Sequence, residues 1–243
     1  MKKQILILLL IPLFSFAQNK KDAELSSNLL LKGIDLHDTG KYYESISSLI
    51  QANEMRPLDD ENYTNKLMLA TYYLGKSKFG LNDFKGAITE FNKIINSNED
   101  FFTVGKDEAI IERAKIKFYI SDYYGVIYDI KSFFENYFIS KKSKYDNDIA
   151  SEAYTLIGHA KAKIGDHNSA IKDYSISIDL NPRNGEAYFL RFYSYFFLES
   201  RSEACDDLRT AIELDYRPTV IIDGVRKIVS ENDFDKLLTY CKD

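Results

Sequence analysis

The residues best suited to chemistry form no recognisable catalytic or metal-binding pattern. The chain has three histidines, His37, His159 and His167. None belongs to an HExxH motif, in which two histidines on one helix face bind zinc. His159 and His167 are eight residues apart with a predicted turn at Gly165 between them, so they should lie on different helices. We therefore predict no metal site.

The sequence also lacks motifs for a catalytic nucleophile and for a phosphate-binding loop. The sequence has no GxSxG motif, no Walker-type phosphate loop and no GxGxxG fingerprint. A cysteine nucleophile needs a neighbouring base, whereas Cys205 lies on a predicted packing face. We interpret the carboxylate pairs Asp59–Asp60 and Asp206–Asp207 as solvated helix ends and faces. The sequence thus predicts neither an enzyme nor a cofactor.

The two cysteines, Cys205 and Cys241, lie late in the chain. Helical spacing places both on apolar faces, so we expect two buried free thiols. A disulfide that locks the last helix is the alternative, because an exported protein can oxidise its thiols. Such a bond requires Cα atoms within about 7 Å of each other.

The N-terminus has the composition of a secretory signal. Lys2 and Lys3 precede an apolar run from Ile5 to Phe16, and Ser15-Phe16-Ala17 resembles a cleavage site with small outer residues. A membrane anchor is the alternative, but the run is too short to cross about 30 Å of hydrocarbon as a helix. We predict a signal peptide at 1–17, cleavage near Ala17, a periplasmic or extracellular location, and no stable membrane insertion of the mature chain.

Composition favours a folded, acidic, helical protein. Hydrophobic residues make up 45% of the 243 residues, and glycine and proline are sparse, which suits an all-helical core. Removal of Lys2 and Lys3 changes the formal net charge from −5 to −7. Non-specific nucleic-acid binding needs a basic surface, so nucleic acid is not an expected partner.

The clearest pattern runs from Ser151 to Asn184, SEAYTLIGHAKAKIGDHNSAIKDYSISIDLNPRN. Gly158 lies in a first helical period and Gly165 marks a turn. Tyr174 lies in a second helical period, and Pro182 ends the unit. The stretch resembles a tetratricopeptide repeat (TPR), a helix–turn–helix of about 34 residues. One such unit cannot bury its apolar face alone, so the resemblance implies neighbouring units.

The same spacing recurs along the chain. The position of Gly158, called here the glycine position, is held in other units by Gly33, Gly75, Ala114 and Phe192. Small residues there predict a close approach of the two helices of a unit, and Phe192 predicts that its two helices are spread or tilted. We predict five units, at about 26–59, 68–101, 107–140, 151–184 and 185–218.

The remaining segments complete the predicted fold. Residues 18–25 are polar and are predicted to be disordered or frayed. Residues 219–243 do not fit another unit, but their apolar residues recur at helical spacing, which predicts capping helices over the end of the stack. The predicted fold class is all-α, a right-handed α-solenoid of about five TPR helix pairs with C-terminal capping helices.

The resemblance also implies a binding face. In TPR proteins the first helices line a concave groove that holds an extended peptide or a partner's helix. Carried over to this sequence, the inward positions form an aromatic surface with isolated lysines, although aromatic residues at helical spacing also occur in cores. The predicted groove residues are Tyr72, Lys76, Phe79, Ile111, Lys115, Phe118, Tyr119, Thr155, His159, Lys163, Phe189, Tyr193 and Phe196.

These patterns favour a non-catalytic scaffold of the bacterial envelope that binds a peptide segment or helix of another protein in this groove. An assembly component that acts through its convex face or its ends is the alternative. A carbohydrate-binding protein or an enzyme is disfavoured. The basic residues with which some TPR domains clamp a C-terminal carboxylate are absent, since Leu30 and Ile34 stand at the first-unit positions. No sequence feature predicts an oligomeric state.

Overall fold

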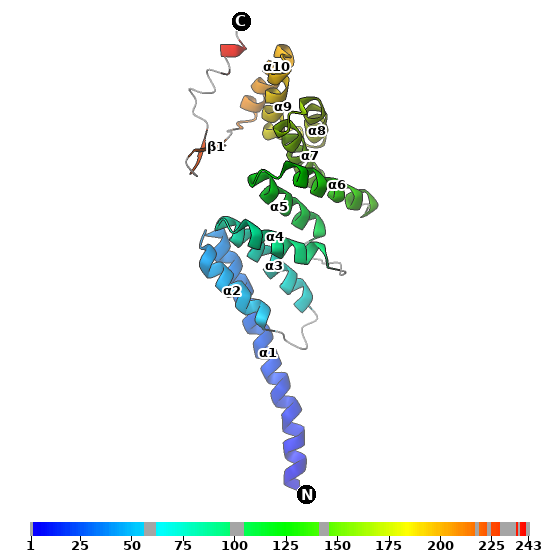
Figure 1. The fold of residues 1–243 in the computed structure, drawn as a ribbon. Coiled ribbons are helices and arrows are strands. Elements are labelled where there is room, and N and C mark those ends of the chain that lie inside the picture. The colour runs from blue at the N-terminus through cyan, green and yellow to red at the C-terminus, as the bar shows by residue number, and fades with distance from the viewer. Residues whose placement is uncertain are drawn as a thin grey trace. The chain divides into compact units, whose positions relative to one another are not determined.

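The computed structural model describes residues 2–55, 62–97, 105–140, 146–216, 219–222 and 225–228, together with Leu237 and residues 239–241. The described chain consists of helices joined in consecutive pairs and one short hairpin (Figure 1). It divides into two compact units, Met1–Ile116 and Lys117–Asp243.

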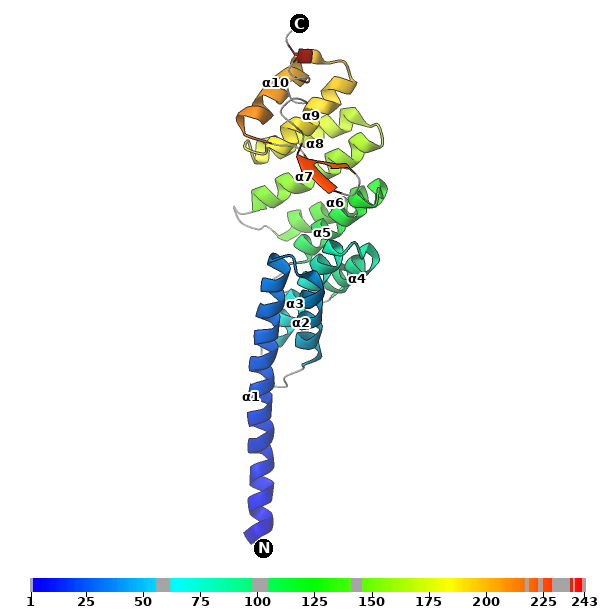
Figure 2. The ribbon, with the colours of Figure 1, turned by 90° about the vertical axis from the view of Figure 1, so that its left-hand side faces the viewer.

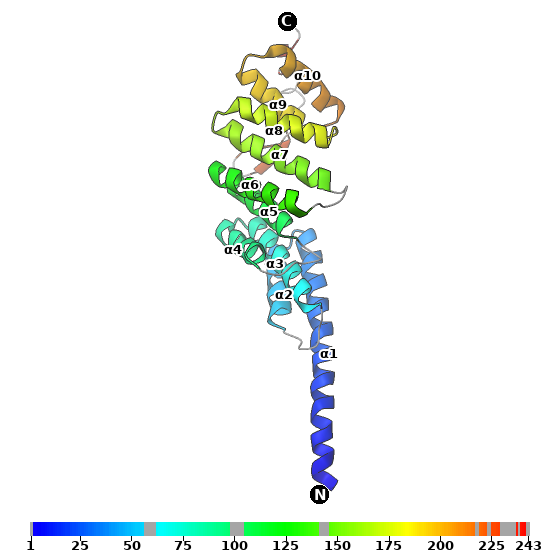
Figure 3. The ribbon, with the colours of Figure 1, turned by 90° about the vertical axis from the view of Figure 1, so that its right-hand side faces the viewer.

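The first unit contains α1 (Lys2–Asp38), α2 (Tyr42–Glu54), α3 (Tyr63–Gly80), α4 (Phe84–Ile95) and most of α5 (Lys106–Tyr119). Helix α1 packs against α2 and α3, and its N-terminal half projects past them (Figures 2 and 3). One buried cluster joins α1, α2 and α3, and a second joins α4 to α5. Their members are Leu30, Leu49, Ala52, Ala70 and Leu74 in the first, and Ala87, Phe91, Ile94, Ala109 and Ile116 in the second.

The second unit contains α6 (Tyr123–Ser140), α7 (Asp146–Lys163), α8 (His167–Leu180), α9 (Gly185–Phe197) and α10 (Arg201–Glu213). Helices α7 and α8 pack together, as do α9 and α10, and α8 also contacts α9. The core of the α9–α10 pair consists of Phe189, Phe192, Ala204, Leu208 and Ala211. Strands β1 (Thr219–Ile222) and β2 (Val225–Ile228) pair antiparallel, with Thr219 opposite Ile228.

The glycine position brings the two helices of a pair close together, as the sequence predicted. A β carbon added to Gly158 would lie 2.8 Å from Cε1 of Tyr174, and one added to Gly75 would lie 2.8 Å from Cζ of Phe91. These distances leave no room for a side chain. Phe192 takes the same position in the α9–α10 pair and is fully buried in one cluster with the smaller Leu208.

The turn between paired helices has one repeated backbone geometry. Seven residues after each glycine position, the chain adopts a left-handed conformation with φ between 59° and 86°. Glycine adopts this conformation without strain, whereas other residues do so at a cost. The residues concerned are Gly40, Asn82, Ser121, Gly165 and Glu199.

Most pairs also share a buried ion pair that the sequence patterns did not single out. A lysine three residues after the glycine position binds an acid fifteen residues after it, with N–O distances of 2.5 to 2.9 Å. These pairs are Lys78–Glu90, Lys117–Asp129 and Lys161–Asp173. In the α9–α10 pair the acid is Asp207, but Tyr195 stands at the lysine position. The cation is Arg191, one residue before the glycine position. A buried charge needs such a partner because burial removes its hydration.

The interpretation of Asp207 as a solvated carboxylate is therefore wrong. Asp207 is 5% exposed and accepts two hydrogen bonds of 2.8 Å from Arg191. Its neighbour Asp206 is exposed, as predicted, and pairs with Arg209 at 2.8 Å. Residues 59 and 60 lie outside the described residues.

Two predictions about the terminal segments are corrected. Residues 18–25 are part of α1 rather than frayed, since their Gln, Lys, Ala and Glu residues all favour helix. Residues 219–222 and 225–228 form paired strands rather than a capping helix, because the β-branched runs on both sides of an Asp-Gly sequence favour a hairpin. Further along, Leu237, Thr239 and Tyr240 have helical backbone.

The cysteine prediction is also corrected. Cys205 and Cys241 form a disulfide, with their Cα atoms 5.5 Å apart. The prediction of two buried free thiols was based on the apolar helical face that carries each cysteine. In the structure these two faces pack against each other, so the two sulfur atoms form a bond.

Candidate protein-binding surface

In each pair, the first helix buries one stripe of side chains against the second helix. A neighbouring stripe of the first helix remains available for contacts outside the pair. Helices α3 and α5 supply this second stripe in the first unit, and α7 and α9 supply it in the second. The predicted groove residues lie along it, but the structure divides them into buried, internally paired and exposed side chains.

In the first unit the predicted groove residues mostly contact one another. The Tyr72 ring lies edge-on to Phe91, with centroids 5.7 Å apart. Lys76 Nζ lies 5.5 Å from the ring centroid of Tyr72, and also 5.5 Å from that of Tyr73. The ring of Phe79 packs against Phe84 at 6.0 Å. These aromatic side chains are half-buried, and Lys76 lies against the rings of Tyr72 and Tyr73.

Two α5 residues of the predicted set have structural roles. Ile111 is 3% exposed and belongs to the core, so its assignment to a binding surface is wrong. Lys115 forms an ion pair with Glu112 at 2.9 Å, one turn earlier on the same helix. Neither offers an open contact point.

Phe118 and His159 contact each other within the second unit. Their ring centroids are 4.3 Å apart. Burial, and then the positive charge of Lys163, lower the pKa of His159 to about 4. The imidazole is therefore uncharged at neutral pH and serves Phe118 as an apolar neighbour. Lys163, in contrast, is exposed at the end of α7.

Thr155 is part of a buried hydrogen-bond network, so its prediction as a groove residue is wrong. It is 5% exposed, and its hydroxyl donates to the Ser151 carbonyl at 3.0 Å. Asn184 Nδ2 donates to the same hydroxyl at 3.0 Å. Asn184 also caps α9, because its side-chain oxygen accepts from Ala187 N at 3.1 Å. Thr155 therefore fixes the start of α9.

Helix α9 carries two exposed aromatic residues of the predicted set. Phe189 is 5% exposed and belongs to the core, which corrects its assignment. Tyr193 and Phe196 are 36% and 40% exposed, and Phe197, which was not predicted, is 64% exposed. Positions i, i+3 and i+4 share one side of a helix. Tyr193, Phe196 and Phe197 thus form a single strip, called here the α9 patch.

The α9 patch is held by rigid neighbours. The Tyr193 ring stands edge-on to Phe189 with centroids 5.0 Å apart, and burial raises the pKa of Tyr193. Phe197 stacks on the ring of His167 at 4.7 Å. Arg191, two residues before Tyr193, joins Asp207 of α10 to Ser175 of α8 through hydrogen bonds of 2.8 Å. The patch therefore lies on a helix fixed from both sides.

Other exposed aromatics lie on α5 and α6. Tyr119 of α5, which was predicted, is 43% exposed. Tyr124 and Tyr128 of α6 are 74% and 71% exposed and lie one turn apart. The sequence held a signal for this α6 pair, since the position of Tyr128 in the other second helices carries Ser47, Thr89, Lys172 or Asp206. An aromatic residue at a position that is otherwise polar is not explained by packing.

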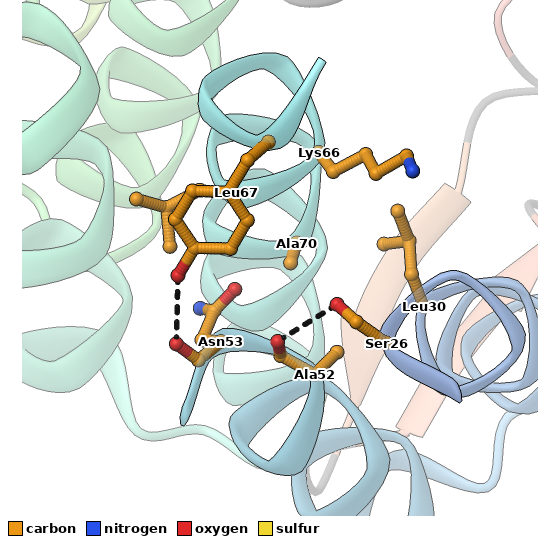
Figure 4. Close-up of a pocket in the computed structure, with 8 residues that line it drawn as sticks. Ser26, Leu30, Ala52, Asn53, Lys66, Leu67 and Ala70 are labelled. Atoms are coloured by element: carbon orange, nitrogen blue, oxygen red, sulfur yellow. Dashed lines mark hydrogen bonds between the residues drawn. The ribbon is translucent and has the colours of Figure 1, made fainter. Parts of the chain in front are cut away.

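A depression between α1, α2 and α3 does not provide a small-molecule site (Figure 4). Ser26 donates to the Ala52 carbonyl and Tyr63 to the Asn53 carbonyl, each at 3.1 Å. The depression has no room for a water molecule. Within the described ranges no cluster of His, Cys, Asp or Glu could hold a metal ion, and no described helix is long and apolar enough to cross a membrane.

Comparison with known proteins agrees with this architecture. Residues 151–184 match the family model described as tetratricopeptide repeat. MamA from Desulfovibrio magneticus RS-1 (residues 41 to the end) superimposes with a TM-score of 0.60 at 16% identity, over 80% of this chain and 95% of that chain. The fold is that of a TPR protein.

Other solved TPR structures are similar. YrrB, described as a TPR protein with an unusual peptide-binding site, has a TM-score of 0.56 at 14% identity, over 82% of this chain and 91% of its own. PilF from Pseudomonas aeruginosa has a TM-score of 0.61 at 11% identity, over 79% and 78%. No curated protein matches the chain in sequence. At these identities the likeness to solved structures establishes the TPR fold alone.

Proposed function

We propose that this protein is a non-catalytic scaffold that binds a segment of another protein through the α9 patch. The observation that carries the proposal is the exposure of three aromatic side chains on one side of a single helix. Exposed apolar patches on folded proteins commonly mark interaction sites, and aromatic residues dominate binding energy at interfaces. Burying one such ring contributes about 1.5 to 3 kcal/mol.

The rigidity of α9 supports this role. The ion pair with Asp207, the hydrogen bond to Ser175 and the Asn184 cap fix the helix before any partner arrives. A fixed aromatic strip loses little conformational entropy on binding. The peptide-binding site named for YrrB, a protein of the same fold, is consistent with a peptide or helix as the ligand class.

We also propose that the protein acts in the bacterial envelope after removal of residues 1–17. The Lys2–Lys3 start and the apolar run before Ala17 support export. The Cys205–Cys241 disulfide supports it independently, because such bonds persist in oxidising compartments. Mass spectrometry of the native protein should give an N-terminus at Gln18 and no thiol that reacts before reduction. A native chain that keeps residues 1–17 and two reactive thiols would contradict export.

Affinity capture from envelope extract tests the binding surface. The bait is the full mature chain, and the variant is Tyr193→Ala/Phe197→Ala. Tyr128→Ala is the matched control, since it removes an even more exposed aromatic ring from a second helix. We expect at least one partner to decrease tenfold or more with the α9 variant and to stay unchanged with the control. If the α9 variant keeps every partner, the α9 patch is not the binding site.

The α6 pair supports a second candidate, an assembly component that binds through its second helices. Tyr124 and Tyr128 are more exposed than any member of the α9 patch. The reciprocal result distinguishes the two candidates. Loss of partners with Tyr124→Ala/Tyr128→Ala, together with full retention in the α9 variant, would favour assembly through α6.

A further inference from the structure

The C-terminal residues lie on the outer side of the α9–α10 pair. Leu237 and Cys241 pack against its core cluster. The Tyr240 ring stands edge-on to Phe196 at 4.9 Å, and the Arg201 guanidinium lies 5.0 Å from the Tyr240 centroid. Arg201 also donates a hydrogen bond to the Tyr240 carbonyl. Together with the disulfide, these contacts hold Leu237, Tyr240 and Cys241, called here the tail, in one place.

Cys205 stands where the other pairs contact their successor. Its position, thirteen residues after the glycine position, carries Ile46, Ile88, Ile127 and Ile171 in the other pairs. Ile46 packs against the cluster that joins α1, α2 and α3, and Ile88 packs against the cluster that joins α4 and α5. This position therefore lies against a core that includes the first helix of the following pair. In the α9–α10 pair it meets Cys241.

Phe196 likewise contacts the tail at a position where other first helices contact the next first helix. It stands four residues after the glycine position, as His37 and Phe118 do. His37 contacts Tyr73 of α3 at 5.4 Å, and Phe118 contacts His159 of α7 at 4.3 Å, so both meet the next first helix. Phe196 meets Tyr240 instead. The tail thus occupies the place that a following first helix would take.

The opposite end of the array carries polar residues at the matching positions. Helix α3 meets the pair before it through Ala70 and Leu74. The equivalent positions of α1 are Asn28 and Lys32, and both are exposed. Leu25 and Leu31 of the same helix are exposed as well.

We propose that the outer side of the α9–α10 pair, formed by Phe196, Arg201 and Cys205, is a docking site for an amphipathic helix. The chain's own tail fills the site while the disulfide is intact. The competing partner is a helix that carries an aliphatic residue, an aromatic residue three positions later and an adjacent cysteine, as Leu237, Tyr240 and Cys241 do.

Thiol–disulfide exchange would open the site. The thiol of the incoming helix loses its proton to water, and the thiolate attacks the Cys205 sulfur. A new disulfide forms with Cys205, the bond to Cys241 breaks, and the Cys241 thiolate takes up a proton. There is no net oxidation. The Cys205–Cys241 cross-link spans 36 residues, and closure of a loop of that length favours the intramolecular disulfide by roughly 10² to 10³-fold. The competing helix therefore has to be in excess or to bind the site more tightly than the tail does.

Peptide exchange on the full mature chain tests this inference. The probe is a synthetic peptide of residues 230–243 with its cysteine, and its control is a scrambled peptide with the cysteine in the same place. Both are incubated with the oxidised protein in a glutathione buffer, and the Cys205 adduct is measured by mass spectrometry. We expect at least tenfold more adduct with the native peptide. Equal adduct from both peptides would overturn the proposal.

Variants show whether the named residues recognise the peptide. Phe196→Ala and Arg201→Ala should each remove most of the preference for the native peptide, and far-UV circular dichroism checks their folding. Tyr128→Ala and Tyr193→Ala/Phe197→Ala should keep the preference. The Tyr193→Ala/Phe197→Ala variant separates the docking site from the proposed α9 function, because it leaves in place Phe196, the residue that both surfaces share. A preference that survives both Phe196→Ala and Arg201→Ala would refute the site.

Hydrogen exchange gives a second readout that does not depend on a variant. Reduction of the intact protein should raise exchange in the tail and in α9–α10, while α7 and α8 keep their protection. If reduction changes nothing, the disulfide does not hold the tail. If all helices of the unit lose protection together, the disulfide is a general staple, and the proposed docking site is wrong.

Discussion

Replacement of Arg191 by Met should strongly destabilise the second unit. Asp207 is 5% exposed, and both of its carboxylate oxygens accept hydrogen bonds of 2.8 Å from Arg191. Met keeps the length of the side chain but leaves this carboxylate buried without a cation. Breaking one side of a buried pair costs about 3 to 5 kcal/mol. Arg191→Met/Asp207→Leu removes both charges and should recover most of the loss.

The neighbouring pair supplies the matched control. Arg209 and Asp206 are also 2.8 Å apart, but their side chains are 56% and 70% exposed. Exposed ion pairs contribute about 0 to 1 kcal/mol, so Arg209→Met should change stability by no more than about 1 kcal/mol. The two substitutions are chemically identical, and their acid partners are adjacent in sequence. Burial is the variable that separates them.

The pH dependence checks the cause. Burial raises the pKa of Asp207, and the hydrogen bond from Arg191 opposes that rise. Without Arg191 the folded pKa rises further, so the penalty applies to the ionised carboxylate. It should be full above the folded pKa and should shrink as the pH falls toward the unfolded value of about 3.9. Urea unfolding followed by circular dichroism at pH 7 and pH 4 measures this. A cost below about 1 kcal/mol at pH 7, or one independent of pH, would refute the reasoning.

Three further predictions follow from the packing of the helix pairs. Gly158→Ala should cost about 1 to 3 kcal/mol in urea unfolding, because its β carbon would meet Tyr174 at 2.8 Å; a stabilised variant would contradict the close approach. Glu199→Gly should stabilise by about 1 kcal/mol, because residue 199 has φ 59°; a lower urea midpoint would contradict that turn geometry. His159 should titrate near pH 4 by NMR, and its contribution of about 3 kcal/mol should be lost as the pH falls from 6.5 toward 4; a midpoint near 6.5 would mean that the ring is not buried.

Periodicity predicted the helix pairs because their packing rule is local. A small residue at Gly33, Gly75 or Gly158 faces a larger one in the same unit, and the spacing repeats with each unit. No comparable packing rule applies to residues 219–243. Ile221, Ile222 and Val225 satisfy helical spacing and β propensity equally well, so spacing alone could not choose between helix and hairpin. The disulfide could not be predicted from spacing, because it depends on whether the helical faces of Cys205 and Cys241 meet in the folded chain.

The exposure of the predicted groove residues was predicted less well than the fold. Carrying over inward positions selected residues of the first helices, but it could not tell a buried ring from an exposed one. Phe189 and Tyr193 are one turn apart on α9, yet only Tyr193 reaches solvent. Thr155 was selected by position, while its role depends on hydrogen bonds to residues in other helices. Asp207 was misjudged because its partner is sixteen residues away in sequence.

Site-specific photo-crosslinking in the native envelope tests the central claim most directly. A photoreactive phenylalanine analogue replaces Tyr193 in one variant and Tyr128 in the other, and cross-linked partners are identified by mass spectrometry. The account predicts a discrete protein adduct from position 193 and none of the same identity from position 128. An adduct from position 128 alone, or no adduct from position 193, would contradict the assignment of the α9 patch as the binding surface.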